Sequence, residues 1–261
     1  MRNLQIQQEI LKVCTDYRFT VGAPKIRLVL RRREYGSINI SLGRVYRILN
    51  NMDLPRYNRK KCYKAFGSPQ NGIFHNKLEQ KFKQPTPNSV WVGDFTYIPA
   101  PSGFYYFAVI LDLFSRKVIG YNVSTNHTCD LVVNAFKQAL GSRKAPTMFH
   151  SDRGSEYTSY AFSDLLDRLH VNASFSKKGY PYDNAVAESF FKHFKQRWCK
   201  SHRYSNITEC RLSIFEYINL YNNKIPHSAA NNLPPSEYEA LYNNDTLIGE
   251  PFNKSFPSPR G

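Results

Sequence analysis

The stretch VWVGDFTYIPAPSGFYYFAVILDLFSRKVIGYNVS, from Val90 to Ser124, decides the fold of this chain. Within it, apolar residues alternate with polar ones or form short unbroken runs, and the turn-forming sequences APSG and FSR interrupt them. Such patterns are typical of β-strands, and connections this short join antiparallel neighbours. The stretch therefore predicts three consecutive antiparallel strands, over residues 90–100, 104–114 and 117–124.

The residues that follow alternate between helical and strand patterns. The predicted elements are a helix over 129–140, a strand over 146–152, a helix over 158–169, a strand over 171–176 and a helix from about Ala185. Three antiparallel strands followed by alternating helices and strands favour a mixed sheet with helices on its faces. We therefore predict an α/β fold built on a mixed five-stranded sheet.

The first third of the chain is predicted to be helical. Apolar spacing indicates helices over 3–16 and 24–34, and Ser41 is a suitable N-cap for a third helix, which carries Arg44 and Arg47 on its outward face. Helix, turn and basic helix form a helix-turn-helix-like arrangement, whose second helix can lie in a DNA groove. On these residues alone, a small helical bundle with a solvated basic face remains an alternative.

Changes in composition indicate the domain boundaries. Residues 55–89 are basic, contain Pro, Gly and Asn, and show little periodicity, which is typical of a linker. We expect a helix-turn-helix-like region over 1–54, a basic linker over 55–89, an α/β core over 90–204 and a C-terminal helical tail over 205–261.

The net charge favours a polyanionic partner. The 261 residues carry a formal charge of +16, and the pI is about 9.6. Residues 1–90 hold 18 Lys and Arg against 5 Asp and Glu, a net of +13, whereas residues 91–261 hold 18 against 15, a net of +3. Because the excess lies in the first third, that part is the candidate for binding nucleic acid.

Other classes of protein fit the sequence poorly. The chain is 41% hydrophobic, enough for a folded core, but no apolar run approaches the ~18 residues that cross a bilayer. The first residues lack the features of a signal peptide, so we expect a cytoplasmic protein without a membrane partner.

The five cysteines form no CxxC pair, which argues against disulfides and a zinc site, and we interpret the Cys199 and His202 spacing as chance.

Two aspartates occupy unusual places in the predicted sheet. Asp94 lies inside a strand, and Asp152 lies at the end of another. Burying either carboxylate alone is costly, and a hard divalent cation such as Mg²⁺ is a natural partner for clustered carboxylates. Taken singly, each aspartate also fits a capping or turn role. A third, Asp112, either supports such a site or pairs with Arg116, and we favour the structural role.

The stretch DNAVAESFFKHFKQRW, Asp183 to Trp198, predicts a helix with two distinct faces. Asp183 or Asn184 can cap it, and an aromatic stripe made by Phe190, Phe194 and Trp198 faces the sheet. Glu188, Lys192 and Lys195 share another edge, because seven residues at about 100° each return to within about 20°. That edge can complete a metal site and hold DNA, or it can form an ordinary salt bridge stabilised by ~0.3–0.5 kcal/mol.

The motifs WVGDFTYI, LDLFSRKVIG, FHSDRGSEYTS and GYPYDNAVAESFFKHFK together resemble the catalytic core of insertion-sequence DDE transposases. More narrowly, the chain is similar to the second-reading-frame product (OrfB) of the group whose cores also resemble retroviral integrases. Asp94, Asp152 and Glu188 match the family's acidic triad, with the 35 residues 153–187 between the last two, and Lys195 matches the basic residue seven positions further on. The likeness extends over nearly the whole chain.

The resemblance implies an RNase H-like integrase core over 90–204. Asp94, Asp152 and Glu188 would then be both the catalytic residues and the ligands of two Mg²⁺ ions, for which Mn²⁺ can substitute, in an in-line phosphoryl transfer on DNA. The products would be a nick at the element end followed by strand transfer. Candidates for holding DNA are Lys195, Lys192, His150, Asn184, Lys177, Lys178, Arg44 and Arg47.

The resemblance also implies partners. These are double-stranded DNA at the element ends and at the target, further copies of the chain on DNA, and the upstream-frame product OrfA or a fusion with it, in the bacterial nucleoid. The chain departs from the family pattern at Glu156, Ile225 and Ala230. Two other functions remain open: an RNase H-like nuclease that only hydrolyses, and a non-catalytic DNA-binding regulator derived from a transposase.

Overall fold

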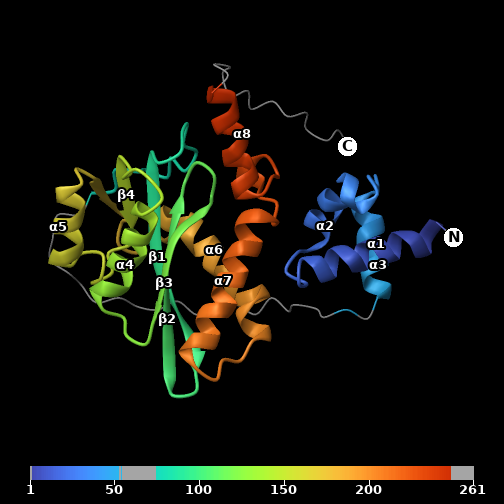
Figure 1. Cartoon of the computed structure of the whole chain (residues 1–261), viewed down its shortest axis with the longest axis horizontal. Coiled ribbons are helices and arrows are strands. Elements are labelled where there is room, and N and C mark those ends of the chain that lie inside the picture. Colours follow the sequence, from blue (N-terminus) through green and yellow to red (C-terminus); the bar gives the residue numbers. More distant parts are fainter. Residues whose placement is uncertain (1, 53, 55–74, 248–261) are drawn as a thin grey trace.

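Helices and strands follow the chain in the order that the sequence pattern predicts (Figure 1). The structure, a computed structural model, describes residues 2–52, 54 and 75–247. Its N-terminal helical part comprises α1 (Arg2–Asp16), α2 (Ala23–Leu30), the 3₁₀ turn η1 (Arg33–Tyr35) and α3 (Leu42–Asn51). The remainder comprises β1 (Val90–Ala100), β2 (Gly103–Asp112), β3 (Val118–Ser124), α4 (Cys129–Leu140), β4 (Met148–Ser151), α5 (Tyr160–Arg168), β5 (Asn172–Phe175), η2 (Pro181–Asn184), α6 (Ala185–Arg197), η3 (Cys199–Ser201), α7 (Ile207–Asn223), η4 (Ser228–Ala230) and α8 (Pro235–Leu247).

The five strands form one mixed sheet in the order β3-β2-β1-β4-β5. β2 is antiparallel to both β1 and β3, whereas β4 is parallel to both β1 and β5. β1 pairs with β2 from Trp91, opposite Asp112, to Ala100, opposite Gly103, but its pairing with β4 stops at Val92. The predicted five-stranded mixed sheet is therefore confirmed, and β1 extends well beyond the end of β4.

Helices cover both faces of this sheet (Figure 1). Successive strand residues point to opposite faces, so each strand supplies two hydrophobic layers. One layer, which packs with α4 and α5, includes Trp91, Ala108, Ile110, Phe136 and Phe162. The other, which packs with α6 and α7, includes Val92, Phe107, Val109, Phe194 and Tyr217.

The aromatic stripe of α6 fixes that helix against β2. The ring of Phe107 lies 6.2, 5.5 and 5.2 Å from the rings of Phe190, Phe191 and Phe194. At the end of the stripe, Trp198 is buried and its Nε1 donates a hydrogen bond to Ser213 Oγ at 2.8 Å. The predicted apolar face is confirmed, and the opposite edge of α6, with Glu188 and Lys192, is exposed.

The helical N-terminal part packs on α6 and α7, and Arg32 pairs with Glu237 of α8 at 3.4 Å. Buried residues of both parts belong to one continuous hydrophobic cluster. Polar contacts add to it: Arg18 pairs with Glu216 at 2.5 Å, and Arg197 Nη1 donates to the carbonyl of Thr20 at 2.8 Å. Within this part, Ser41 accepts a hydrogen bond from Arg44 N and caps α3 as predicted. The helical domain is thus attached to the core by a mixed apolar and polar interface.

The predicted linker is only partly a linker. Residues 55–74 lie outside the described residues. Residues 75–89 pack on the core, because Lys77 N and Leu78 N both donate to Ser174 Oγ in β5, at 2.9 and 3.1 Å. Leu78 is buried. The core therefore begins about fifteen residues before β1, and composition could not reveal this because a few backbone groups and single side chains, and no periodic apolar pattern, make the contacts.

The C-terminal tail also belongs to the core. Ile225 is buried in the main hydrophobic cluster, and Ala230 is buried beside Phe114 and Tyr238. Both departures from the family pattern therefore serve packing in this chain. None of the helices in the described ranges is both long and apolar enough to span a membrane.

Candidate active site

Asp94 lies in the middle of β1, just beyond the last residue that pairs with β4. Its Oδ1 accepts a hydrogen bond from the backbone N–H of Phe95 at 2.8 Å. Burial raises the pKa of the Asp94 carboxyl well above its ordinary value, and the negative charges of Asp152 and Glu188 raise it further. A half-buried carboxylate surrounded by other carboxylates is electrostatically unfavourable unless a cation joins it.

Asp152 directly follows β4, and because β4 runs parallel beside β1, its end brings Asp152 near Asp94. Its Oδ1 accepts from Gly154 N at 2.9 Å. Burial raises the pKa of Asp152, and the charge of Glu156 adds to this effect. A Cβ at position 154 would lie 3.1 Å from Asp152 Oδ1, so the glycine allows the turn to fold closely around the carboxylate.

Glu188 lies in the first turn of α6, exposed, on the edge opposite the aromatic stripe. Its charge acts on Asp94, so the three predicted acids face one region. Within the described residues, no three His, Cys, Asp or Glu side chains are already placed to hold one metal ion. The three acids therefore lie within reach of one another's charge without forming a ready-made coordination shell.

Lys195 lies two turns beyond Glu188 and its ammonium group sits 4.3 Å from the ring centre of Tyr97. The Lys195 charge lowers the pKa of Asp94, opposing the larger effect of burial. The ring of Tyr97 is half exposed beside Phe104, 5.2 Å away. The ammonium group of Lys195 is thus held on an aromatic face within reach of the charge of Asp94.

The other residues predicted to contact DNA differ in how far they are exposed to solvent. Lys177, Lys178, Lys192 and Arg47 are exposed, and Arg44 is partly exposed. Asn184 is only 4% exposed, and its Oδ1 is buried without a hydrogen-bond partner among the described residues. The exposed cations are therefore open to solvent, whereas Asn184 is not.

His150 is placed differently from its predicted role. It is fully buried in β4, with Nδ1 2.9 Å from Ser174 Oγ and Nε2 3.2 Å from Ser176 Oγ. Burial lowers its pKa to about 4, so the imidazole is neutral at pH 7. A direct contact between His150 and DNA is thus ruled out by its position, and the side chain instead ties β4 to β5.

Neither Asp183 nor Asn184 caps α6 as predicted. The N-cap position is Asn184, and its side chain makes no capping hydrogen bond. Asp183 instead accepts from Lys177 N at 2.9 Å and from Gln80 Nε2 at 2.8 Å. The reason is the intervening 3₁₀ turn η2, which turns both side chains away from the first N–H groups of α6. Asp183 thereby holds the turn that carries Lys177 and Lys178.

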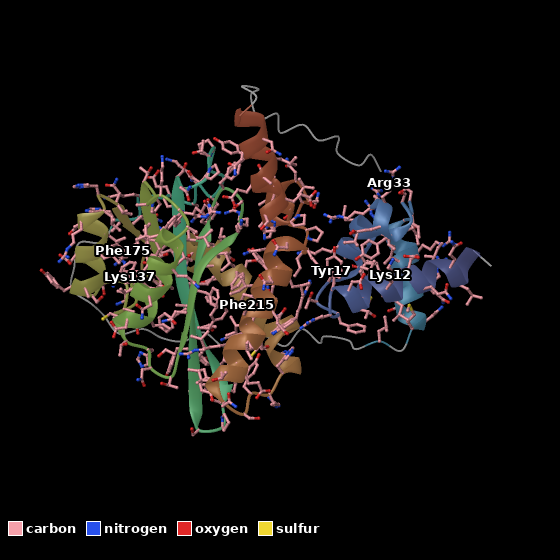
Figure 2. The ribbon with its side chains drawn as sticks, viewed as in Figure 1. Lys12, Tyr17, Arg33, Lys137, Phe175 and Phe215 are labelled. Carbon is pink, nitrogen blue, oxygen red and sulfur yellow. The ribbon has the colours of Figure 1, made fainter. Side chains whose placement is uncertain are left out.

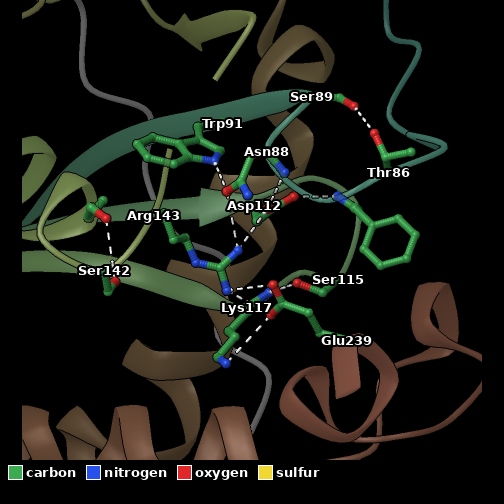
Figure 3. Close-up of polar contacts among 12 residues, drawn as sticks. Thr86, Asn88, Ser89, Trp91, Asp112, Ser115, Lys117, Ser142, Arg143 and Glu239 are labelled. Carbon is green, nitrogen blue, oxygen red and sulfur yellow. Dashed lines mark hydrogen bonds and ion pairs between the residues drawn. The ribbon is translucent and has the colours of Figure 1, made fainter. Parts of the chain in front are cut away.

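Asp112 has a structural role, as favoured, but with a different partner (Figure 3). It is fully buried and pairs with Arg143 Nη1 at 3.2 Å, while the backbone N–H groups of Asn88 and Phe114 donate to it at 2.8 Å. Arg143 also binds Glu239 of α8, at 2.6 Å. Arg116, the predicted partner, donates instead to the carbonyl of Phe82.

A cavity of about 480 Å³ adjoins this network and is lined in part by Asn88, Lys117, Arg143, Glu239 and Asn243.

Two residues near Asp152 were not predicted as parts of the site. Glu156 is buried, with Oε1 3.0 Å from His127 Nδ1. Tyr157 is fully buried, and its hydroxyl has no hydrogen-bond partner in the described part of the chain. Burial raises the pKa of Tyr157 well above its ordinary value, and the charges of Asp94 and Asp152 raise it further. Glu156 was visible as a departure from the family pattern, whereas nothing in the sequence marks Tyr157 as buried beside two carboxylates.

The donor set suits a hard divalent cation. It consists of carboxylate oxygens from three elements, and the two half-buried aspartates destabilise each other when both are charged. Oxygen donors of this kind are the ligands of Mg²⁺ and Mn²⁺, and a shared cation would remove the repulsion. The residues therefore fit a magnesium-type site.

Comparison with known protein families finds matches to the same two parts of the chain, the helical N-terminal part and the α/β core. The Integrase core domain family matches residues 84–181 and again 169–235, and the HTH-like domain family matches residues 1–61. Among solved structures, the HTLV-2 integrase catalytic core domain in complex with magnesium is similar over 59% of this chain and 97% of that chain, with 19% identity and a TM-score of 0.48. The catalytic core domain of BIV integrase gives 18% identity and a TM-score of 0.47, over 61% and 99% of the two chains.

Curated relatives are transposases. The transposase for insertion sequence element IS904 of Lactococcus lactis is 34% identical over 90% of this chain and 95% of that protein. The transposase InsF for insertion sequence IS3A of Escherichia coli is 38% identical over 68% of this chain, but the match spans only 62% of InsF. Since the first match covers both chains almost completely, this chain belongs to the family of insertion sequence transposases, with an integrase core preceded by a helix-turn-helix-like domain.

Proposed function

We propose that this chain cuts DNA at the ends of an insertion sequence and joins those ends to target DNA, using Asp94, Asp152 and Glu188. One observation carries the proposal: three elements bring these carboxylates within reach of one another's charge, with burial and mutual repulsion raising the pKa of Asp94. Such an arrangement is unfavourable for folding alone and favourable for binding cations.

The proposed cofactor is a pair of Mg²⁺ ions, with Mn²⁺ able to substitute. Asp94 and Asp152 would contribute to both sites, and Glu188 would complete one of them. When bound, such ions lower the pKa of an attacking water or orient a 3′-hydroxyl, and they stabilise charge on the departing oxygen. The backbone N–H groups of Phe95 and Gly154 orient the two aspartates for this role, because each already binds an Oδ1 atom.

Cations of the chain would position the DNA. Lys195 rests on Tyr97 and its charge acts on Asp94, and Lys192, Lys177 and Lys178 are exposed, which supports this role. On the helical domain, Arg44 and Arg47 would contact DNA from α3. Contacts of this kind fix the position of DNA without reading its sequence unless they reach base edges.

The proposed partners are double-stranded element ends and target DNA, further copies of this chain assembled on that DNA, and the upstream-frame product OrfA or a fusion with it. We expect these complexes in the bacterial cytoplasm, associated with the nucleoid. The charge distribution supports this expectation, because the first third of the chain is strongly basic.

Nicking and joining of labelled DNA that carries the ends of the encoding element tests the proposal. With Mg²⁺ or Mn²⁺, wild type should give nicked and joined products, and Glu188→Gln should lower both by at least ~100-fold, since a lost metal ligand removes several kcal/mol of transition-state stabilisation. Asp167→Asn, which removes an exposed carboxylate on α5, is the matched control and should retain activity.

The products distinguish the remaining functions. Nicking without joining would identify a nuclease that only hydrolyses. DNA binding without nicking, in the presence of the upstream-frame product as well as in its absence, would contradict the enzymatic proposal and identify a DNA-binding regulator.

A further inference from the structure

Glu156, in the turn between β4 and α5, is a buried carboxylate without a role in the proposed reaction. Its side chain is only 7% exposed, whereas that of its partner His127 is 59% exposed. Oε1 of Glu156 lies 3.0 Å from His127 Nδ1, and Oε2 accepts a hydrogen bond from Ser155 Oγ at 3.1 Å. The ring of His127 packs in turn on that of Tyr106, with the ring centres 4.8 Å apart. The carboxylate of Glu156 is therefore fixed at both of its oxygens.

This carboxylate lies beside Asp152, across Gly154. A Cβ on Gly154 would be 3.1 Å from Asp152 Oδ1 and 3.2 Å from Glu156 Oε2, so oxygens of the two acids approach the same point. Tyr157 Cδ2 is 3.6 Å from that point, and Tyr157 is fully buried. Charges in such a poorly hydrated place act on each other more strongly than charges in water. The charge of Glu156 accordingly raises the pKa of Asp152, after the larger effect of burial.

Hydrogen bonding alone does not explain a carboxylate at this position. A glutamine has the same shape, and its amide could accept from His127 and pair with the hydroxyl of Ser155, which can act as donor or acceptor. Burying a charged group costs more free energy than burying an amide. The property that Glu156 adds, and that a glutamine would lack, is a negative charge close to Asp152. Such a charge is unfavourable in the cation-free chain and favourable once a cation is bound.

We propose that Glu156 is a positioning residue of the metal site, whose fixed negative charge strengthens the binding of divalent cations at Asp152. The inference rests on the proposed function, because it requires cations to bind at Asp94, Asp152 and Glu188. Since both of its oxygens are held, the Glu156 carboxylate stays beside Asp152 and attracts a cation through its charge. The site thus uses four acids, three as ligands and the fourth as a fixed charge beside them.

The binding of Mn²⁺ to the whole chain, in the absence of DNA, tests this role. Free Mn²⁺ is measured by electron paramagnetic resonance, and the binding that Asp94→Asn abolishes is taken as binding to the site. Wild type is compared with Glu156→Gln, which keeps the shape and removes the charge, and with Glu156→Asp, which keeps the charge. Two variants control for net charge. Asp167→Asn removes an exposed carboxylate from α5, and Lys137→Gln removes an exposed lysine from α4, on the far side of the sheet from the helical domain (Figure 2).

Glu156→Gln should raise the Kd for Mn²⁺ at least about fivefold, because the attraction of one negative charge is lost. Glu156→Asp should bind Mn²⁺ within about threefold of wild type, since the charge remains, and both control variants should match wild type. Thermal unfolding in EDTA gives a second measurement: the Tm of Glu156→Gln should equal or exceed that of wild type, because repulsion with Asp152 is relieved. A lower Tm in EDTA, or an unchanged Kd, would assign Glu156 to a structural ion pair with His127 and overturn the proposal.

The outcomes separate this inference from the proposed function. Equal Mn²⁺ binding by wild type and Glu156→Gln would overturn the role of Glu156 and leave the proposed metal site intact. Absence of site-specific Mn²⁺ binding in wild type would count against the proposed cofactor itself, and the role of Glu156 would fail with it. Weaker Mn²⁺ binding in Glu156→Gln, together with a wild type that does not nick DNA, would support the role of Glu156 and count against the proposed enzyme.

Discussion

Asp94 and Asp112 lie in neighbouring strands, but different groups surround their carboxylates. Asp112 is surrounded by its own partners, two backbone N–H groups and Arg143. Asp94 receives one backbone N–H group and faces two further carboxylates. The first arrangement gives the carboxylate partners from the chain itself, and the second leaves negative charge that a bound cation can neutralise.

Removing the charge of Asp94 should therefore stabilise the metal-free chain. Asp94→Asn relieves repulsion with Asp152 and the burial of a charge, and we expect Tm in EDTA to rise by about 2–4 °C, the shift produced by ~1 kcal/mol in a chain of this size. Added Mg²⁺ should raise the Tm of wild type and leave Asp94→Asn unchanged, since only the former retains the site. Asp167→Asn serves as the control. A lower Tm for Asp94→Asn in EDTA would contradict the assignment.

Asp112 predicts a dependence of stability on pH. Burial raises its pKa from 3.8 to about 6, against the smaller opposing effects of its N–H partners and Arg143. Between about pH 4 and 6 the folded chain thus retains a proton that the unfolded chain releases, so this group's contribution to stability falls as pH rises through that window. In urea unfolding at pH 4.5 and pH 7, Asp112→Asn should lose less stability than wild type over this interval. Parallel changes in the two chains would show that Asp112 titrates normally.

For individual residues, the sequence identified the three acids but not the partners of the buried polar side chains. Asp94, Asp152 and Glu188 could be singled out because motif and spacing mark them, although their catalytic role stays a prediction. The burial of His150 could not be foreseen, because it depends on Ser174 and Ser176 of a strand that is adjacent only after folding. Arg143 as the partner of Asp112 was missed for the same reason.

Close approach between elements depends on single glycines. α4 crosses β3 at Gly120, where a Cβ would lie 2.2 Å from Ala135 O and 2.9 Å from Ala139 N, both backbone atoms that cannot move aside. Gly43, inside α3, has nothing within 4 Å of its Cβ position. The same substitution should therefore have opposite effects at these two sites.

Gly120→Ala should destabilise the chain by about 3 kcal/mol or more, because α4 must move away from the sheet. Gly43→Ala should stabilise α3 by ~1 kcal/mol, since alanine has the higher helix propensity and meets no neighbour. Urea unfolding followed by circular dichroism measures both. A neutral Gly120→Ala would show that α4 does not pack as closely as described.

Most elements could be predicted from periodicity, including the limits of β1 and α4, because their apolar patterns are long and unambiguous. The helix expected over 24–34 instead ends at Leu30 and is followed by η1. Apolar spacing did not reveal this end, because the extended backbone of Arg32 and the left-handed backbone of Gly36, on either side of η1, break the helix. The 3₁₀ turn before α6 was missed similarly, and with it the true role of Asp183.

For the molecule as a whole, the uneven distribution of charge along the chain is the property with the widest consequences. The helical domain, which carries part of the positive charge of the first third, is attached to α6 and α7 through Arg18, Arg197 and a shared hydrophobic cluster. Sequence could locate the charge but not this attachment, since no motif encodes which face of a helical domain meets another domain.

Arg47 tests the role of this domain. It is exposed on α3, beside a buried layer formed by Val45 and Ile48. Arg47→Ala should weaken binding to duplex DNA and reduce the slope of log K against log [salt] by about 1, while leaving Tm unchanged. Lys137→Ala, on α4, should retain the wild-type slope. If both variants behave alike, α3 does not contact DNA.

The distribution of the three acids along the chain has a consequence during protein synthesis. Asp94 and Asp152 are contributed by the sheet, but Glu188 arrives only with α6. A ribosome that stops before Ala185 releases a fragment with the basic helices and two acids of the three. Under the proposed function, such a fragment lacks the third metal ligand and could not cut DNA, and it also lacks the α6 and α7 side of the hydrophobic core. Catalysis therefore has to wait until the chain has been synthesised beyond α6.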